Sequence, residues 1–219
     1  MSRHLQIELD KLRKKILALG TNVEESVRLA FQALQNRDIQ IVKQVKDADD
    51  IIDQQEVEVE EECLKILALH QPVAIDLRFI VGVLKMNNDL ERIGDEAVNL
   101  VNKAQQLALH PPLPINFQFD QMSRITREML RDALDAMINM DTVVAERVCA
   151  SDDKVDEMKV DVREKVRHGF HEHPDNAEAL IASLGVARNL ERIADLATNI
   201  AEDVIYMVNG EIVRHGGTQ

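Results

Sequence analysis

The sequence predicts an all-α protein built from two tandem, structurally similar three-helix bundles. Its composition favours long helices over sheets, because the chain is rich in helix-forming residues and has only 3% aromatic residues, no Trp, 8 Gly and 5 Pro. Apolar residues recur at spacings of three and four, as on one face of an amphipathic helix. The same succession of motifs occurs twice within 219 residues, which indicates an internal duplication.

The first half contains three helical patterns separated by two breaks. One apolar stripe marks the first helix: Leu5, Leu9, Leu12, Ile16, Leu19, Val23 and Ala30. A turn at Gln35–Asp38 ends this helix, and Asp38 is a candidate N-cap of the next. A second stripe follows: Val45, Ile52, Val59, Cys63 and Ile66. It stops before Pro72, because proline belongs in a first helical turn rather than a helix interior, and the third pattern extends to about Leu109.

The second half repeats this plan beyond a proline-rich stretch, residues 110–116, which is the only strong linker signal in the sequence. The segment "RDALDAMINMD" (131–141) aligns with "RLAFQALQNRD" (28–38) at an offset of 103 residues. Likewise, "NLERIADLATN" (189–199) shares seven of eleven residues with "DLERIGDEAVN" (89–99). We therefore predict a first bundle at residues 1–109, a linker at 110–116 and a second bundle at 117–219.

Charge and composition exclude several classes of partner and function. A formal net charge of −13 repels phosphate, so neither nucleic acid nor anionic lipid is expected as a direct partner. The N-terminus lacks an apolar signal core and no stretch approaches 18 apolar residues, so we expect a soluble, cytoplasmic protein without direct membrane insertion. Cys63 and Cys149 share no motif and are expected to be reduced thiols. No catalytic motif is visible, so we do not expect an enzyme.

Each half carries two acidic pairs at spacing i and i+4, which places both carboxylates of a pair on one helix face beside the core stripe. The pairs are Asp49 and Asp53 with Glu91 and Asp95 in the first half, and Asp152 and Asp156 with Glu191 and Asp195 in the second. If the helices are neighbours, four carboxylates converge and raise one another's pKa unless a cation is present. Hard oxygen ligands at this density suit Fe, Mn, Mg or Ca, and less specifically Zn.

Two simpler interpretations of these acidic pairs remain open at this point. An acidic pair on a helix is typical of a solvated surface, and Glu91 and Asp95 could pair locally with Arg92 or Lys85. The duplication does not decide between metal binding and salt bridges, because a duplicated structure duplicates its salt bridges as well.

Two long stretches resemble the signature sequences of the PhoU family, which are bacterial regulators of phosphate signalling. They are "QPVAIDLRFIVGVLKMNNDLERIGDEAVN" (71–99) and "NLERIADLATNIAEDVIYMVNGEIVRH" (189–215), and the resemblance covers nearly the whole chain. It implies a fold of two similar three-helix bundles whose E/D-x-x-x-D motifs bind multinuclear metal clusters. The implied ligands are Asp49, Asp53, Glu91, Asp95, Asp152, Asp156, Glu191 and Asp195.

Three positions depart from this pattern. Leu196 stands where many relatives have His after the second motif's Asp. Lys159 and Arg163 align with Glu56 and Glu60, so the second unit has less negative charge with which to hold cations. We therefore expect its site to be weaker or to hold fewer ions.

The resemblance also implies a function: repression of the phosphate-starvation response when phosphate is plentiful. Such a regulator links the cytoplasmic ATPase of the phosphate ABC transporter to a sensor histidine kinase, and it reaches the membrane through these proteins. We also expect a homodimer. Two other classes compete, namely a carboxylate-bridged di-iron enzyme or iron store, and a plain helical scaffold. Di-iron sites typically use Glu-x-x-His pairs aimed into a four-helix core, and no His in this sequence has Glu three residues before it.

Overall fold

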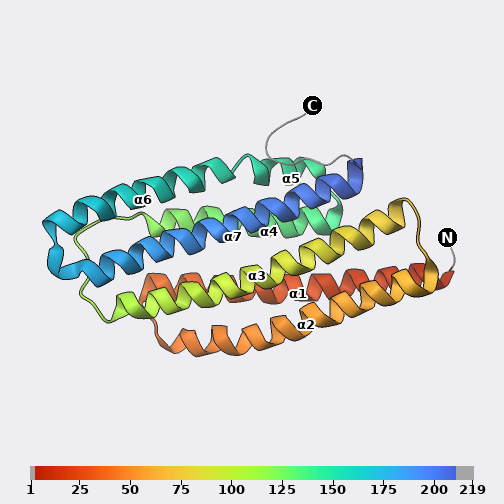
Figure 1. The fold of residues 1–219 in the computed structure, drawn as a ribbon, viewed down its shortest axis with the longest axis horizontal. Helices are drawn as coiled ribbons and strands as arrows, with labels where there is room; N and C mark the ends of the chain where they lie inside the picture. Colours follow the sequence, from red (N-terminus) through yellow and green to blue (C-terminus); the bar gives the residue numbers. More distant parts are fainter. Residues whose placement is uncertain (1–2, 211–219) are drawn as a thin grey trace.

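The computed structural model describes residues 3–210, and throughout that range its regular structure is helical (Figure 1). The elements are α1 (Arg3–Asn36), α2 (Gln40–His70), α3 (Ile75–Ala108), α4 (Phe119–Asn139), α5 (Thr142–Cys149), α6 (Asp152–Glu172), a short 3-10 helix (Pro174–Asn176) and α7 (Ala177–Asn209). This confirms the predicted all-α class. Residues 211–215, the end of the second signature stretch, lie outside the described range.

Two similar units lie side by side, one made of α1, α2 and α3, the other of α4, α5 with α6, and α7 (Figure 1). The predicted six-helix plan is therefore confirmed, with the middle helix of the second unit divided in two. The division is slight, because Ala150 and Ser151 keep right-handed helical backbone angles. The Ser151 N–H donates to the Val148 carbonyl at 2.9 Å, which tightens the turn to a 3-10 type before α6 begins.

Short polar contacts set the helix starts that the sequence indicated. The Asp141 carboxylate accepts from the Val143 and Val144 N–H groups at 2.9 and 3.1 Å, and so caps α5. The Asp38 carboxylate accepts from the Gln40 N–H at 2.9 Å, which starts α2 although Asp38 lies one residue before the cap position. No described helix is apolar enough over sufficient length to cross a membrane.

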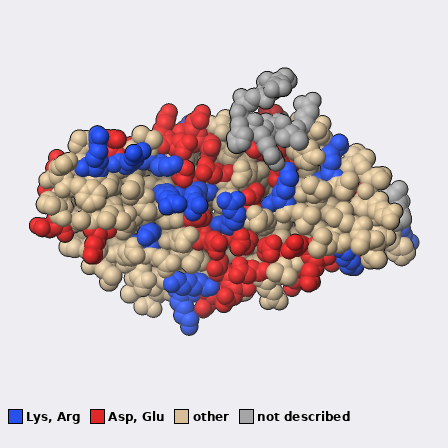
Figure 2. All heavy atoms as spheres, viewed as in Figure 1, with Lys and Arg blue, Asp and Glu red and all other residues tan. Residues whose placement is uncertain are grey.

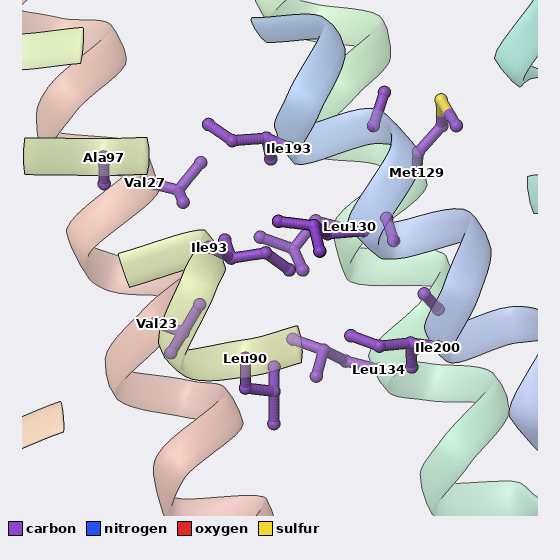
Figure 3. Close-up of a cluster of buried hydrophobic side chains, with 14 of the residues drawn as sticks. Val23, Val27, Leu90, Ile93, Ala97, Met129, Leu130, Leu134, Ile193 and Ile200 are labelled. Carbon is purple, nitrogen blue, oxygen red and sulfur yellow. The ribbon is translucent and has the colours of Figure 1, made fainter. Parts of the chain in front are cut away.

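One continuous hydrophobic core runs through both units. α3 and α7 pack antiparallel at the centre of the molecule (Figure 1), and apolar side chains from four helices meet between them (Figure 3). Leu90 and Ile93 of α3, Leu130 of α4 and Ile193 of α7 are fully buried there. The helices approach so closely that a Cβ on Gly82 of α3 would lie 2.4 Å from the Met207 Sδ of α7. This packing fixes the faces on which the acidic residues lie.

Candidate functional site

In the first unit, α2 and α3 bring the four predicted ligands together with two further carboxylates, Glu56 and Glu60, into one group, which we call the first acidic cluster. It comprises Asp49, Asp53, Glu56 and Glu60 of α2 with Glu91 and Asp95 of α3. The two helices pack closely where the fully buried Ile52 of α2 meets Gly94 of α3, since a Cβ on Gly94 would lie 3.2 Å from the Ile52 Cγ2. Because i and i+4 residues share a helix face, this packing leaves the carboxylates along the border of the core, where they are half-buried or exposed.

The carboxylates of the first acidic cluster lie close enough to oppose one another's ionisation. Burial, followed by the charges of Asp53 and Asp95, raises the pKa of Asp49 to about 6. Burial also raises the pKa of Glu91 and that of Asp95, and the charge of Asp53 adds to both shifts. In each case the physical causes are loss of water and repulsion between like charges, so the folded unit holds negative charge that it does not neutralise.

None of the described ion pairs involves a member of the first acidic cluster. The local partners considered from the sequence turn elsewhere: Arg92 contacts Asp89 at 3.4 Å, and Lys85 contacts Asp203 at 2.8 Å. Local salt bridges therefore do not account for Glu91 and Asp95.

A buried amide adjoins the first acidic cluster. Asn87 of α3 is 1% exposed, and its Nδ2 donates to the Glu56 carbonyl oxygen at 2.9 Å and to Glu56 Oε1 at 3.1 Å. The Asn87 Oδ1 is buried without a hydrogen-bond partner. A buried acceptor of this kind is uncommon in native structures, and here it adds one more oxygen beside the carboxylates.

The second acidic cluster comprises Asp152 and Asp156 of α6 with Glu191 and Asp195 of α7. Burial, and then the charges of Glu191, Asp152 and Asp156, raises the pKa of Asp195 to about 6. Unlike the first cluster, this one contains a cation. The Lys159 Nζ donates to Glu191 Oε1 and lies 3.9 Å from Asp156 Oδ1. The Lys159 charge opposes the rise in the pKa of Asp195.

The eight predicted ligands thus fall into two clusters of neighbouring carboxylates on the expected helix pairs. Hard oxygen donors at this density fit Mg, Mn or Fe ions. As the side chains lie in residues 3–210, no group of three or more Asp, Glu, His or Cys is arranged so that it could hold a metal ion. The two clusters are sets of adjacent donors rather than closed cages, and the ligand assignment stays a prediction.

Sequence reasoning missed a polar seam between the two clusters, where α3 meets α7. Glu96 of α3 is 6% exposed and accepts from Asn189 Nδ2 at 2.6 Å and from Arg192 at 2.7 Å, both on α7. Asp89 is buried as well, and burial raises its pKa to about 6 against the opposing effect of Arg92. The available signal was that Glu96 and Asp89 align with the uncharged Leu196 and Asn189.

A groove of 920 Å³ follows this seam and reaches both clusters. Asp95 from the first cluster and Asp152 and Asp195 from the second line it, together with Arg92 and Arg192. Figure 2 shows the same arrangement as two groups of acidic side chains, one over α2 and α3 and one over the start of α6, with basic side chains between them. The two clusters therefore open onto a single face of the molecule.

Comparison with known proteins agrees with this architecture. A family model described as the PhoU domain matches residues 16–104 and again residues 119–204, one match in each unit. The chain belongs to the PhoU family. A PhoU homolog of Aquifex aeolicus, named phosphate-specific transport system accessory protein, is 38% identical over 95% of this chain and 94% of its own length. The PhoU protein of Escherichia coli, also named an accessory protein of that system, is 32% identical over 99% of this chain and 90% of its own length.

Solved PhoU structures share the fold. The crystal structure of PhoU from Pseudomonas aeruginosa superposes with a TM-score of 0.91 at 37% identity, covering 94% of this chain and 99% of that one. The phosphate transport system regulatory protein PhoU from Streptococcus pneumoniae gives a TM-score of 0.89 at 27% identity, covering 96% of this chain and all of that one. The tandem three-helix architecture is therefore that of PhoU proteins.

Proposed function

We propose that this protein is a cation-binding regulatory accessory protein of a phosphate transport system. The names of its PhoU relatives support the transport assignment, since they are called accessory proteins of the phosphate-specific transport system. They also agree with the expectation that the chain is not an enzyme. The observation that carries the cation-binding part is the first acidic cluster, whose carboxylates raise one another's pKa without a described counterion.

Divalent or trivalent cations, singly or as a multinuclear group, would be held in the first unit by Asp49, Asp53, Glu91 and Asp95. In the second unit Asp152, Asp156, Glu191 and Asp195 would hold them. The ions would supply positive charge where α2 meets α3 and α6 meets α7. Ions bound there would reduce the repulsion among the carboxylates of each cluster and would link the two helices that carry them.

The regulatory part of the proposal is negative control of phosphate uptake and of the phosphate-starvation response. The protein would act as an adaptor between the ATPase of the phosphate ABC transporter and a sensor histidine kinase, reaching the membrane by docking on these proteins. The face that carries both acidic clusters is the natural place for cation-dependent contacts, because ions bound there alter the charge that a partner meets.

Deleting the gene tests the regulatory proposal. In phosphate-rich medium the deletion strain should express phosphate-starvation genes, and the wild-type gene should silence them again. The variant Asp53→Asn with Asp95→Asn should restore silencing less well, at equal protein level. Asp120→Asn with Asp135→Asn, which removes two exposed carboxylates of α4, should restore it fully.

The outcomes separate the two parts of the proposal. Starvation genes that stay silent in the deletion strain at high phosphate contradict the regulatory role. Full silencing by the variant that lacks Asp53 and Asp95 shows that repression does not require cations in the first unit.

A further inference from the structure

Lys159 stands at the position in α6 that Glu56 occupies in α2, at the repeat offset of 103 residues. Both side chains are half-buried and belong to the middle helix of their unit. Glu56 adds a carboxylate to the first acidic cluster, whereas Lys159 brings an ammonium group into the second. The Lys159 Nζ donates to Glu191 Oε1 and lies 3.9 Å from Asp156 Oδ1.

We propose that Lys159 is a built-in counterion of the second acidic cluster, and that a metal ion binds this cluster only by displacing the Lys159 ammonium group. This inference rests on the cation binding proposed above. It assigns the two units different properties: the first binds cations without an internal competitor, and the second binds them against one.

Lys159 contacts two of the carboxylates that would bind the metal. Glu191 and Asp156 are two of the four oxygen donors assigned to a metal in this unit; Glu191 accepts a hydrogen bond from the ammonium group, and Asp156 lies within ion-pair distance of it. A lone pair of a carboxylate oxygen that accepts a hydrogen bond from an ammonium group is not free to coordinate a metal ion. A metal ion bound to the same carboxylates would also be repelled by the nearby ammonium charge. Metal and ammonium therefore exclude each other.

Lys159 is also able to leave. Its side chain is 39% exposed, and its flexible four-carbon stem lets the ammonium group swing into water without moving α6. The buried partner in the pair is Glu191, whose side chain is 15% exposed and which stays beside the incoming ion. As the metal concentration rises, the first cluster is therefore expected to bind metal at lower concentrations and the second at higher ones.

The test measures Mn²⁺ binding by calorimetry in protein whose first cluster has lost two of its four assigned donors, through Asp53→Ala and Asp95→Ala. In that background Lys159→Met, which retains most of the apolar stem and removes the charge, should lower the Mn²⁺ dissociation constant at least about tenfold. Lys154→Met is the matched control, because Lys154 is an exposed lysine of the same helix. It should change the constant much less, because solvent and salt screen its charge. Lys159→Arg keeps the charge and should stay weak.

The reciprocal exchange tests the first cluster. In protein whose second cluster has lost two of its four donors, through Asp156→Ala and Asp195→Ala, Glu56→Lys should weaken Mn²⁺ binding at least about tenfold. Glu61→Lys, at an exposed position of the same helix, makes the same charge change away from the cluster and should have a much smaller effect.

Unfolding in the absence of metal tests the counterion role of Lys159 separately from metal binding. In excess chelator, Lys159→Met should unfold at lower urea than Lys154→Met, because the second cluster has lost its counterion, and Mn²⁺ should remove the difference. Equal dissociation constants for the two variants overturn the inference while leaving cation binding intact. A wild-type protein that binds no Mn²⁺ refutes the proposed cation binding itself, and the displacement step with it.

Discussion

The two acidic clusters occupy equivalent places in the two units, yet they differ in whether a protein cation lies among the carboxylates that repel one another. The first gathers six carboxylates and no described counterion, whereas in the second Lys159 neutralises Glu191 from within. The apolar residues beneath them differ far less, since Leu90 and Ile93 recur as Leu190 and Ile193, all fully buried. The fold tolerates this divergence because the buried stripes hold the helices together, while residues on the border of the core change charge at small cost to packing.

Equivalent positions of the two units also differ in charge at the buried seam between α3 and α7. Glu96 and Leu196 are equivalent and both are buried, but only Glu96 meets polar partners, Asn189 and Arg192, on the opposite helix. A buried carboxylate is tolerated where such donors satisfy it. Antiparallel packing of α3 and α7 therefore lets one side of the seam be polar while its repeat stays apolar.

The largest expected effect concerns metal itself. Asp95→Ala combined with Asp195→Ala removes a donor from each cluster, so elemental analysis of the purified variant should find the metal of the wild-type protein lost. Circular dichroism should show unchanged helical content, because both side chains lie at the border of the core. Equal metal content in variant and wild type would make the ligand assignment wrong for both units.

A smaller but substantial effect is expected at the seam. Arg192→Ala should lower the free energy of unfolding by about 2–3 kcal/mol, because Glu96 stays buried without its cation. Adding Glu96→Leu, which copies the Leu196 of the other unit, should recover most of that loss. Urea unfolding of both single variants and the double variant measures the coupling. Additive losses would show that Arg192 does not stabilise Glu96.

Asp89 and its equivalent Asn189 give a pH-dependent comparison. Burial raises the pKa of Asp89 to about 6, so the folded protein holds this proton more tightly than the unfolded chain does. In chelator, the free energy of unfolding should therefore fall as pH rises from about 4 to about 6. Asp89→Asn should remove part of that fall and stabilise the protein by about 1–2 kcal/mol at pH 7.

The control for this profile is Asp135→Asn, which alters an exposed carboxylate of α4. Its unfolding free energy should follow the wild-type pH dependence. A profile for Asp89→Asn that matches the wild type over pH 4 to 7 would contradict the assigned role of burial at Asp89.

The smallest effect sharpens the comparison between the clusters. In a chelator titration, Asp195→Ala, which keeps the first cluster intact, should hold its metal roughly tenfold more tightly than Asp95→Ala, which keeps the second. The reason is that Lys159 competes in the second cluster and Arg163 adds a further positive charge on the same helix. Tighter retention by Asp95→Ala would reverse the ranking of the two units.

Much of this architecture follows from the sequence. The spacing of Leu5, Leu9 and Leu12 predicts a helix face, and these residues are buried in α1. The repeated "LERI" motif predicts a second copy of the same helix, and α3 and α7 are that pair. Likewise, Asp49 and Asp53 face Glu91 and Asp95 as expected from an i, i+4 spacing on neighbouring helices. These features depend on periodicity and turn chemistry, which act within a few residues along the chain.

Only the tertiary structure decided which charged side chains meet. From the sequence, Arg92 and Lys85 were as good partners for Glu91 and Asp95 as any, but Lys85 reaches Asp203 across the seam and Arg92 turns to Asp89. The contacts of Glu96 with Arg192 and of Lys159 with Glu191 join residues on different helices. Such contacts depend on how the buried surfaces of two helices fit and slide into register, and local periodicity does not contain that information. The sequence by itself thus determined the helices and their acidic faces, and packing determined which of those charges a protein cation neutralises.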